Sequence, residues 1–301
     1  MLNILYYKYV NMGTKKDLEN FQIKHLALCK KLNLKGRVLI AGEGINGNLT
    51  GENKNIDQYK KELKKDKRFS DIQFKEGLTD SHNFRKMFVR MKPEIVTWKL
   101  NADIKNKANY IEPEELKRLF DKEDDFVVFD IRNGYEYDIG HFKNAVRMNI
   151  DKSAELPTVI NDLKKYKNKK IVTCCTGGVR CEKASAYLRE NGFKDIKQLH
   201  GGIIHYGEVC GNAHWNGKCF VFDTRGAVDL DPKNQNKPIT QCVLCNVPSD
   251  SYHNCSNAKC DRRFIACSKC FEILNNCCSK ICRNVLKTNP EYYNKNANVA
   301  I

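Results

Sequence analysis

A cysteine-containing loop in the middle of the chain has the residue types needed for thiol chemistry. Its reactive residue is predicted to be Cys175, which directly follows an apolar strand over Lys170–Cys174. The loop leads to a helix predicted over Glu182–Asn191 through Thr176, Gly177, Gly178, Val179, Arg180 and Cys181. Backbone N–H groups that converge in such a loop stabilise a thiolate, as does the positive end of the helix. Because Arg180 adds a full positive charge, we predict that Cys175 is the catalytic residue of an anion-binding loop.

A second group of cysteines lies near the C-terminus, where nine of the fifteen in the chain fall between Cys242 and Cys282. At this density in a cytoplasmic protein, cysteines are expected to bind metal rather than form disulfides. Two C-x2-C pairs predict one tetrahedral site with the ligands Cys242, Cys245, Cys267 and Cys270. A second site is predicted from Cys255, Cys260, Cys282 and one of Cys277 and Cys278, with Cys278 as the chosen ligand.

The segment that carries these cysteines, residues 240–286, is too short to have much of an apolar core of its own. We therefore expect structural zinc in both sites, since metal binding then supplies the folding energy. An iron–sulfur cluster is the less favoured alternative, and it would supply electrons.

The elements that position the cysteine loop belong to a predicted α/β domain over residues 110–225. Its strands Phe126–Asp130 and Lys170–Cys174 are apolar runs without alternation, a pattern typical of a parallel strand covered on both faces, and Ile196–Leu199 is predicted as a third strand. Helices are predicted over Pro113–Phe120 and Leu156–Tyr166. In open α/β sheets, ligands bind at the carboxyl ends of the strands, which is where Cys175 lies.

Residues 1–98 are predicted to form a separate ferredoxin-like α+β sandwich with the order β-α-β-β-α-β. The predicted strands are Leu2–Tyr9, Gly36–Ala41, a partner from Gly47 to Thr50, Ile72–Phe74 and Met87–Met91. The predicted helices are Asp17–Leu32, opened by Thr14 or Asp17, and Ile56–Leu63.

A glycine-rich turn in this first domain, Gly42–Gly47, matches the pattern G-x-G-x-x-G after a strand. A dinucleotide site requires a helix to begin at that turn, so that its N-terminus faces the pyrophosphate. Here Asn48-Leu49-Thr50-Gly51 follows, which suits a strand. We therefore interpret the motif as a turn between two strands and reject a dinucleotide-binding fold.

The charge of the chain favours a polyanionic partner. The formal net charge is +16, and residues 1–100 contain 21 Lys and Arg against 11 Asp and Glu.

No apolar run approaches the roughly 20 residues that a membrane helix needs. The N-terminal segment also lacks the basic and apolar regions of a signal peptide. We expect a cytoplasmic protein that does not bind membranes.

Several motifs of the central region resemble those of a rhodanese domain. They are Asp130-Ile-Arg132, Glu136, Gly140-His141, Ala145, the Cys175–Arg180 loop and Gly201-Gly202. The six residues from Cys175 to Arg180 resemble the loop of a sulfurtransferase, whereas related phosphatases use a loop one residue longer. Because Cys174 to Arg180 would satisfy the longer spacing, a phosphatase stays open on counting alone. Cys175 is preferred because Cys174 still belongs to the strand.

The wider combination of motifs resembles the tRNA uridine(34) hydroxylase family over nearly the whole chain. It consists of Arg37–Gly47, Lys92–Val96, Cys175–Ser185, Gly201–Ile203, Phe220–Asp223 and the cysteine-rich segment. The resemblance implies an acylphosphatase-like first domain and Cys175 as the active cysteine. It also implies oxygen-dependent formation of 5-hydroxyuridine at the wobble position, with the tRNA anticodon loop as partner. One departure is Gly42, where many relatives are expected to have an acidic residue.

Two other functions remain as alternatives at this point. The loop alone favours a sulfurtransferase that carries a persulfide on Cys175 to another acceptor. The third hypothesis is a zinc-stabilised RNA-binding module with an inert rhodanese fold, against which the intact Cys175 and Arg180 count. The electron donor, any protein partner and the role of Cys181 do not follow from the sequence.

Overall fold

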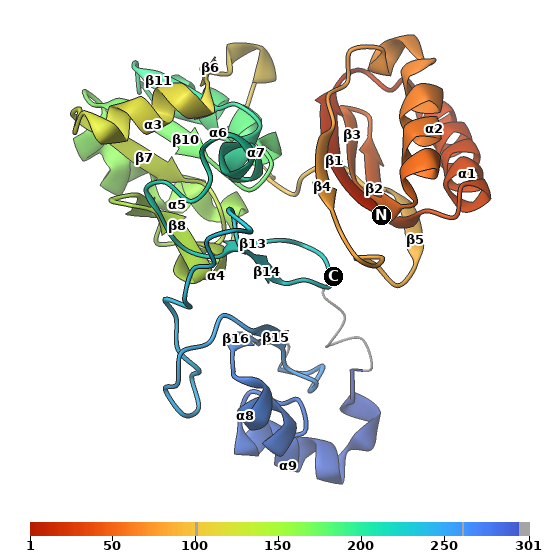
Figure 1. Cartoon of the computed structure of the whole chain (residues 1–301), viewed down its shortest axis with the longest axis vertical. Helices are drawn as coiled ribbons and strands as arrows, with labels where there is room; N and C mark the ends of the chain where they lie inside the picture. Colours follow the sequence, from red (N-terminus) through yellow and green to blue (C-terminus); the bar gives the residue numbers. More distant parts are fainter. Residues whose placement is uncertain (100–101, 261, 295–301) are drawn as a thin grey trace. The chain divides into compact units, whose positions relative to one another are not determined.

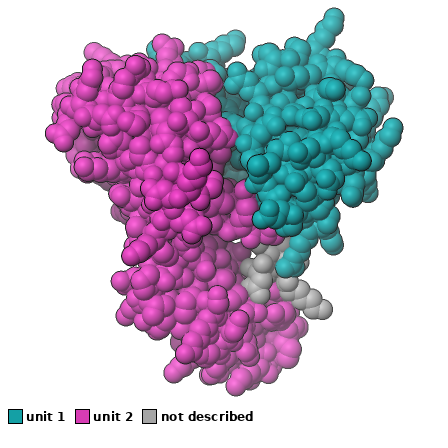
Figure 2. All heavy atoms as spheres, viewed as in Figure 1, with its two compact units in different colours: residues 1–107, 177–190 teal, residues 108–176, 191–301 magenta. Residues whose placement is uncertain are grey.

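The computed structural model of the protein describes residues 1–99, 102–260 and 262–294. The chain forms two compact units, each of which is discontinuous in sequence (Figure 2). Residues 1–107 form one unit together with residues 177–190, and residues 108–176 form the other with residues 191–301. The boundary between the units therefore falls between Thr176 and Gly177, just after Cys175. Within the described part of the chain, no helix is long and apolar enough to cross a membrane.

The first domain contains the predicted sandwich of one sheet and two helices (Figure 1). Its sheet has the strand order β4-β1-β3-β2-β5, in which β4-β1-β3-β2 is the ferredoxin-like order and β5 adds a parallel edge strand. The strands are β1 (Leu2–Tyr9), β2 (Lys35–Ala41), β3 (Gly44–Gly51), β4 (Lys75–Leu78) and β5 (Met87–Met91). The helices are α1 (Lys15–Lys31) and α2 (Asn53–Lys64), followed by the short helix η1 (Lys67–Phe69).

Alternation along the strands gives this sheet two different faces. Ile4 and Tyr6 of β1 pack with Val38 and Ile40 of β2 against the apolar sides of α1 and α2. Tyr7 and the other odd-numbered residues of β1 point to the opposite face, because successive side chains of a strand alternate. Of the two residues predicted to open α1, Thr14 is the N-cap, and it forms a capping box with Asp17.

One predicted strand is wrong. Ile72–Phe74 has no strand structure, and β4 begins at the following residue, Lys75. Ile72 ends a turn in which its N–H donates to the carbonyl of Phe69, and its side chain is buried in the core. The apolar residues of this segment therefore mark core contacts made by a turn, which sequence alternation cannot distinguish from a short strand.

The glycine-rich turn joins two antiparallel strands, so the rejection of a dinucleotide-binding fold is confirmed. Ala41 pairs with Gly44, which leaves Gly42 and Glu43 as the turn itself. A Cβ atom on Gly44 would lie 2.1 Å from the carbonyl oxygen of Lys8, and one on Gly47 would lie 2.2 Å from the Tyr6 ring. These glycines allow β1 to approach β3 closely. A Cβ on Gly42 meets no atom within 4 Å, so the acidic residue expected in relatives would fit there.

The second domain has the predicted parallel sheet, with strand order β6-β11-β10-β7-β9. Its strands are β6 (Asn109–Ile111), β7 (Phe126–Asp130), β9 (Val146–Arg147), β10 (Lys170–Cys174) and β11 (Ile196–Leu199). Its helices are α3 (Pro113–Asp121), α4 (Gly134–Ile139), α5 (Leu156–Leu163) and α7 (Gly202–Cys210), with the short helices η3 (Ser153–Glu155) and η4 (Lys164–Tyr166). The short helix η2 (Ile104–Asn106) belongs to the first unit. The small two-stranded sheets use β8 (Gly140–Phe142), β12 (Trp215–Gly217), β13 (Cys219–Phe220) and β14 (Ala227–Val228).

The helix after the cysteine loop, α6 (Val179–Glu190), begins three residues earlier than predicted. Arg180 and Cys181 therefore lie in its first turn rather than in a loop. The cysteine-rich segment contains the hairpin of β15 (Tyr252–Asn254) and β16 (Arg263–Ile265), then α8 (Ser268–Ile273), α9 (Lys280–Thr288) and η5 (Pro290–Tyr292).

Candidate active site and metal centres

The cysteine loop lies at the carboxyl end of the central strand of the parallel sheet. Strand β10 has β7 and β11 as its neighbours and ends at Cys174, so Cys175 is the first residue beyond it. Gly178 has a φ of 96°, a conformation that favours glycine, and it turns the chain into α6. Cys175, Cys181 and Arg180 are all buried, with exposed fractions of 0%, 0% and 6%. The chain thus has the strand–turn–helix geometry that the sequence predicted for an anion-binding loop.

Cys174, the last residue of β10, is a poor nucleophile. Its side chain belongs to the apolar core of the second domain. Burial raises the pKa of the Cys174 thiol well above its ordinary value, and the nearby carboxylate of Asp130 raises it further. A thiol with this pKa is protonated at neutral pH. The longer Cys174–Arg180 spacing of a phosphatase loop therefore lacks a usable thiolate.

The rhodanese-like motifs around the loop form buried hydrogen bonds that fix the chain on either side of it. Asp130 and Arg132 form a fully buried pair, with Nε to Oδ1 at 2.8 Å and Nη2 to Oδ2 at 2.6 Å. Arg132 Nη2 also donates to the carbonyl of Gly140 at 2.5 Å. Glu136, which is fully buried, accepts a hydrogen bond from the Thr176 hydroxyl at 3.3 Å. These groups fix the end of β7 and the first turn residue after Cys175.

The Gly201-Gly202 motif brings a second helix terminus to the loop. Both glycines have positive φ angles, 70° and 73°, which lead the chain from β11 into α7. The N–H of Ile203 then donates to the carbonyl of Cys175 at 2.9 Å, and that of Ile204 donates to the carbonyl of Thr176 at 3.1 Å. Two N–H groups from the first turn of α7 are therefore satisfied by the cysteine loop.

The motifs around Glu43 and Glu94 contribute a buried ion cluster that sequence reasoning missed. Lys183 of α6 lies 2.8 Å from Glu43 Oε2 and 2.9 Å from Glu94 Oε1. The Lys183 side chain is only 6% exposed, and those of Glu43 and Glu94 are 29% and 21% exposed. All three residues stand in motifs of the family pattern, but Glu43 and Glu94 are 140 and 89 positions from Lys183 in sequence, and no local signal pairs them with it.

Further hydrogen bonds hold the two carboxylates of this cluster in place. Glu43 accepts from the backbone N–H of Ile95 at 2.9 Å. Glu94 accepts from the N–H groups of Trp98 and Lys99 at 2.8 and 2.9 Å. Partial burial acts to raise the pKa of Glu94, but hydrogen bonds from Lys99, Trp98 and Lys183 hold it below its ordinary value. Glu94 is therefore ionised at neutral pH and paired with Lys183.

The structure brings each predicted set of metal ligands together. Cys242, Cys245, Cys267 and Cys270 form one group, and Cys255, Cys260, Cys278 and Cys282 form the other. Within each group, all four sulfur atoms lie within 4.8 Å of one another. The sulfur of Cys277 instead faces the carbonyl oxygen of Asn275. The ring of His253 stacks on Phe271 at 3.7 Å, and its Nε2 faces the carbonyl of Ala266.

The spacing of these sulfur atoms suits a single tetrahedral ion in each group. Four Zn–S bonds of about 2.3 Å place the sulfur atoms about 3.8 Å apart. The Sγ–Sγ distances are 3.7 Å for Cys245–Cys267, Cys260–Cys278 and Cys278–Cys282. An iron–sulfur cluster spreads its cysteines over several iron atoms separated by sulfide, so it fits four thiols around one point less well.

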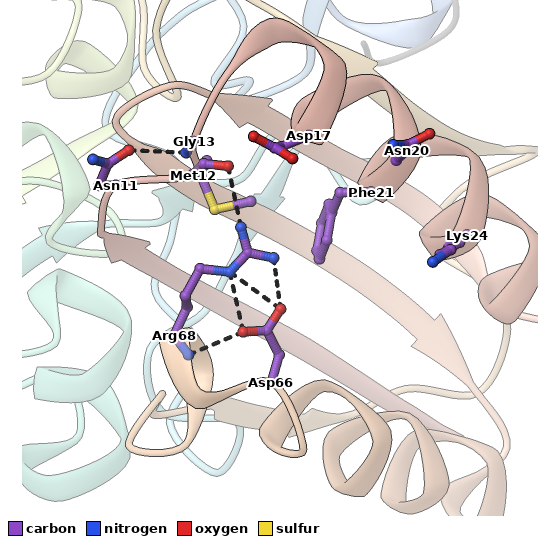
Figure 3. Close-up of a pocket in the computed structure, with 9 residues that line it drawn as sticks. All are labelled: Asn11, Met12, Gly13, Asp17, Asn20, Phe21, Lys24, Asp66 and Arg68. Carbon is purple, nitrogen blue, oxygen red and sulfur yellow. Dashed lines mark hydrogen bonds and ion pairs between the residues drawn. The ribbon is translucent and has the colours of Figure 1, made fainter.

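A cavity in the first domain has no residues that point to chemistry. It has a volume of about 710 Å³ and is lined by residues of α1 and η1 and the segments before them, among them Arg68 and Asp66 (Figure 3). The guanidinium of Arg68 donates to Asp66 at 2.6 Å and to the carbonyl of Met12 at 3.2 Å. Asp17 is used by the cap of α1. Because these polar groups bond to one another, we assign the cavity no chemical role.

Comparisons with known proteins extend over all three parts of the chain. Residues 1–95 match the model of the UPF0176 acylphosphatase like domain, residues 112–207 the Rhodanese-like domain, and residues 216–283 the Rhodanase C-terminal model. A tRNA uridine(34) hydroxylase from Bacillus licheniformis is 45% identical over 88% of this chain and 83% of its own length. A protein of the same name from Cytophaga hutchinsonii is 41% identical over 93% of this chain and 89% of its own.

This chain belongs to the tRNA uridine(34) hydroxylase family. It is therefore an enzyme, and the mixed α/β fold expected from its resemblance to that family is confirmed. The features of the candidate site and metal centres lie in three different family models. The carboxylates of Glu43 and Glu94 lie in the first, the cysteine loop with Lys183 in the second, and both groups of four cysteines in the third.

Proposed function

We propose that this protein hydroxylates uridine 34 of tRNA to 5-hydroxyuridine, with molecular oxygen as co-substrate and Cys175 as nucleophile. The observation that carries the proposal is the 41–45% identity with tRNA uridine(34) hydroxylases across all three parts of the chain. The excess of positive charge, +16, supports a polyanionic substrate such as tRNA. Wobble bases stand in a single-stranded loop, so one can be splayed into a pocket at little unstacking cost.

The chemistry proposed for Cys175 begins with addition of its thiolate, or of a persulfide that it carries, to C6 of the uracil ring. The addition breaks the C5–C6 double bond and makes C5 electron-rich, so that C5 attacks an oxygen species. Loss of the C5 proton and of the sulfur nucleophile then restores the ring and regenerates the thiolate. When molecular oxygen is the source, one atom enters the base and the other leaves as water, which requires two electrons from a reductant.

We further propose that each group of four cysteines binds one structural zinc ion. The nearly tetrahedral spacing of the sulfur atoms supports this assignment. The core of this segment also consists largely of the cysteines themselves, with Phe264, Ala266, Phe271 and Leu274 as its buried apolar residues. A segment with so small a core depends on its metal for folding, so we expect the ions to be structural rather than catalytic.

Mass spectrometry of tRNA nucleosides tests the proposal. A strain that lacks the gene should lose 5-hydroxyuridine and its derivatives at position 34, and the wild-type gene should restore them only when oxygen is present. A gene with Cys175→Ser should not restore them, whereas Cys174→Ser should. Full restoration by Cys175→Ser would refute the role of Cys175.

A sulfurtransferase is the second candidate, because the six-residue spacing from Cys175 to Arg180 favours it. The same strains distinguish the two functions. Persulfide formation on Cys175 from thiosulfate, combined with unchanged tRNA nucleosides in the deletion strain, would support the sulfurtransferase and refute the hydroxylase.

A further inference from the structure

Two side chains of the N-terminal domain hold carbonyl groups in the turn after Cys175. Lys75 of β4 donates from Nζ to the carbonyl of Gly177 at 2.8 Å. The Tyr9 hydroxyl of β1 donates to the carbonyl of Val179 at 3.2 Å. These contacts lie inside one compact unit, since residues 177–190 group with residues 1–107 (Figure 2). The turn that follows the reactive cysteine is thus held by the sheet of the first domain.

With these two contacts, each backbone carbonyl group of the cysteine loop accepts a hydrogen bond. The carbonyls of Cys175 and Thr176 accept from the N–H groups of Ile203 and Ile204, and the carbonyl of Gly178 accepts from the N–H of Cys181 at 3.0 Å. Every carbonyl from Cys175 to Val179 therefore has a donor. The carbonyl of Gly177 accepts from a side chain, and that of Val179, the first residue of α6, accepts from one in addition to its backbone bond within the helix; both side chains come from the first domain.

Holding a carbonyl also fixes the direction of the neighbouring N–H group. The peptide unit is planar and trans, so its C=O and N–H point in opposite directions. The bond from Lys75 therefore sets the direction of the Gly178 N–H, and the bond from Tyr9, together with the helix bond to the same carbonyl, holds that of the Arg180 N–H. Gly177 and Gly178 have no Cβ atoms to restrict them, so this stretch of backbone would otherwise be the most adaptable part of the loop.

A second layer of contacts keeps α6 on the same sheet. Tyr7 donates to Glu182 Oε1 at 2.9 Å, and Lys107 lies 2.6 Å from Glu182 Oε2. Lys183 is bound by Glu43 and Glu94 as described above. Lys75 also lies 5.2 Å above the Tyr7 ring, which orients its ammonium group. These contacts make the first turn of α6 part of the first domain rather than a free helix end.

We propose that Lys75 and Tyr9 are positioning residues for Cys175: by holding the carbonyls of Gly177 and Val179, they set the direction of loop N–H groups that stabilise its thiolate. The first domain then determines the reactivity of the cysteine in addition to any role in binding substrate. This inference rests on the proposed function only in taking Cys175 as the reactive thiol.

The test measures the reactivity of Cys175 in the full-length, metal-loaded protein, without tRNA. The variants are Lys75→Met, Tyr9→Phe and the conservative Lys75→Arg. The protein is alkylated with iodoacetamide across about pH 5 to pH 9, where thiolates form. Trypsin then releases the peptide Ile171–Arg180, and its fragment ions separate the label on Cys175 from that on Cys174.

We expect Lys75→Met and Tyr9→Phe to raise the apparent pKa of Cys175 by about one unit. Below that pKa, alkylation of Cys175 then slows by about tenfold, while the limiting rate at high pH stays the same. Lys75→Arg should keep the wild-type profile, because arginine also donates to a carbonyl. Tyr9→Phe separates the effect of loop direction from that of charge, since it removes only a hydroxyl.

Lys8→Met is the matched control. Lys8 precedes Tyr9 on β1, points to the opposite face of the sheet and pairs with Asp71, so its loss should leave the profile unchanged. If the pH profiles of Cys175 alkylation were superimposable for wild type, Lys75→Met and Tyr9→Phe, the inference would be refuted and the proposed function would stand. An ordinary pKa of about 8.5 for Cys175 in the wild type would instead overturn the proposed nucleophile, and the inference with it.

Discussion

The buried ion cluster at Lys183 leads to the most direct prediction about stability. Replacing Lys183 with methionine keeps the apolar stem of the side chain but leaves the carboxylates of Glu43 and Glu94 without their cation. Removing one partner of a buried pair costs about 3–5 kcal/mol. Because the two carboxylates are 29% and 21% exposed and Glu94 keeps two backbone donors, we expect a smaller loss, about 2–3 kcal/mol.

The assay uses one of the only two tryptophans in the chain as a reporter. Trp98 is fully buried in the first unit, and its backbone N–H donates to Glu94, so its fluorescence follows unfolding of this unit. Trp215 lies in the other unit and is replaced by phenylalanine in every protein compared. Urea denaturation then gives the free energy of unfolding, and the expected loss corresponds to a fall in melting temperature of roughly 10 °C.

Two controls make the result specific to the cluster. A triple variant with Lys183→Met, Glu43→Gln and Glu94→Gln removes the unpaired charges and should recover at least half of the lost stability. Lys60→Met is the matched control, because Lys60 also binds two carboxylates at 2.8 Å, but these are 54% and 39% exposed. Its loss should cost under about 1 kcal/mol.

Two outcomes would refute the reasoning about this cluster. In one, Lys183→Met costs no more than Lys60→Met, which would show that partial burial does not strengthen the cluster. In the other, the triple variant is as unstable as Lys183→Met alone, so that the lost stability comes from packing and not from unpaired charge.

Three further predictions concern the metal centres, the loop glycines and the dependence on pH. Elemental analysis should find two zinc ions per chain, one after Cys245→Ala and still two after Cys277→Ala; an equal loss from both variants would contradict the ligand sets. Gly178→Ala should destabilise the protein by about 1–2 kcal/mol in thermal unfolding because of the positive φ of Gly178. Gly177→Ala should cost less, since its Cβ would meet only one atom, at 3.9 Å, and equal effects would refute the strain argument. The folded-state pKa of Glu94 is lowered, so its contribution to stability is complete above about pH 4.5 and is lost as the pH falls through that lowered value. Glu94→Gln should therefore flatten the fall in unfolding free energy between about pH 5 and pH 3, as urea titrations can measure.

Much of the second domain could be predicted because its signals are local. Strand β10 is an unbroken apolar run, the cysteine follows it at once, and the glycines mark the turn. The start of α6 was wrong by three residues because Val179, Arg180 and Cys181 carry no capping signal, and their helical conformation depends on contacts made elsewhere in the chain.

Other parts of the site could not be predicted because the contacts join distant positions. Lys75 and Gly177 are 102 residues apart, and Tyr9 and Val179 are 170 apart. No periodicity or spacing connects such pairs. The motifs that contain Glu43 and Glu94 were visible as patterns, but their common partner, Lys183, appears only once the chain is folded.

The division of the chain into units also has a consequence for its synthesis. The last helix of the first unit, α6, is made only after the stretch between Lys107 and Gly177, which takes a ribosome on the order of several seconds. During that time, Glu43 and Glu94 lack Lys183, the lysine that pairs with both in the folded chain. The nascent first domain is therefore incomplete until residue 190 has emerged, and a fragment cut at the apparent domain end near residue 98 would remain in that incomplete state.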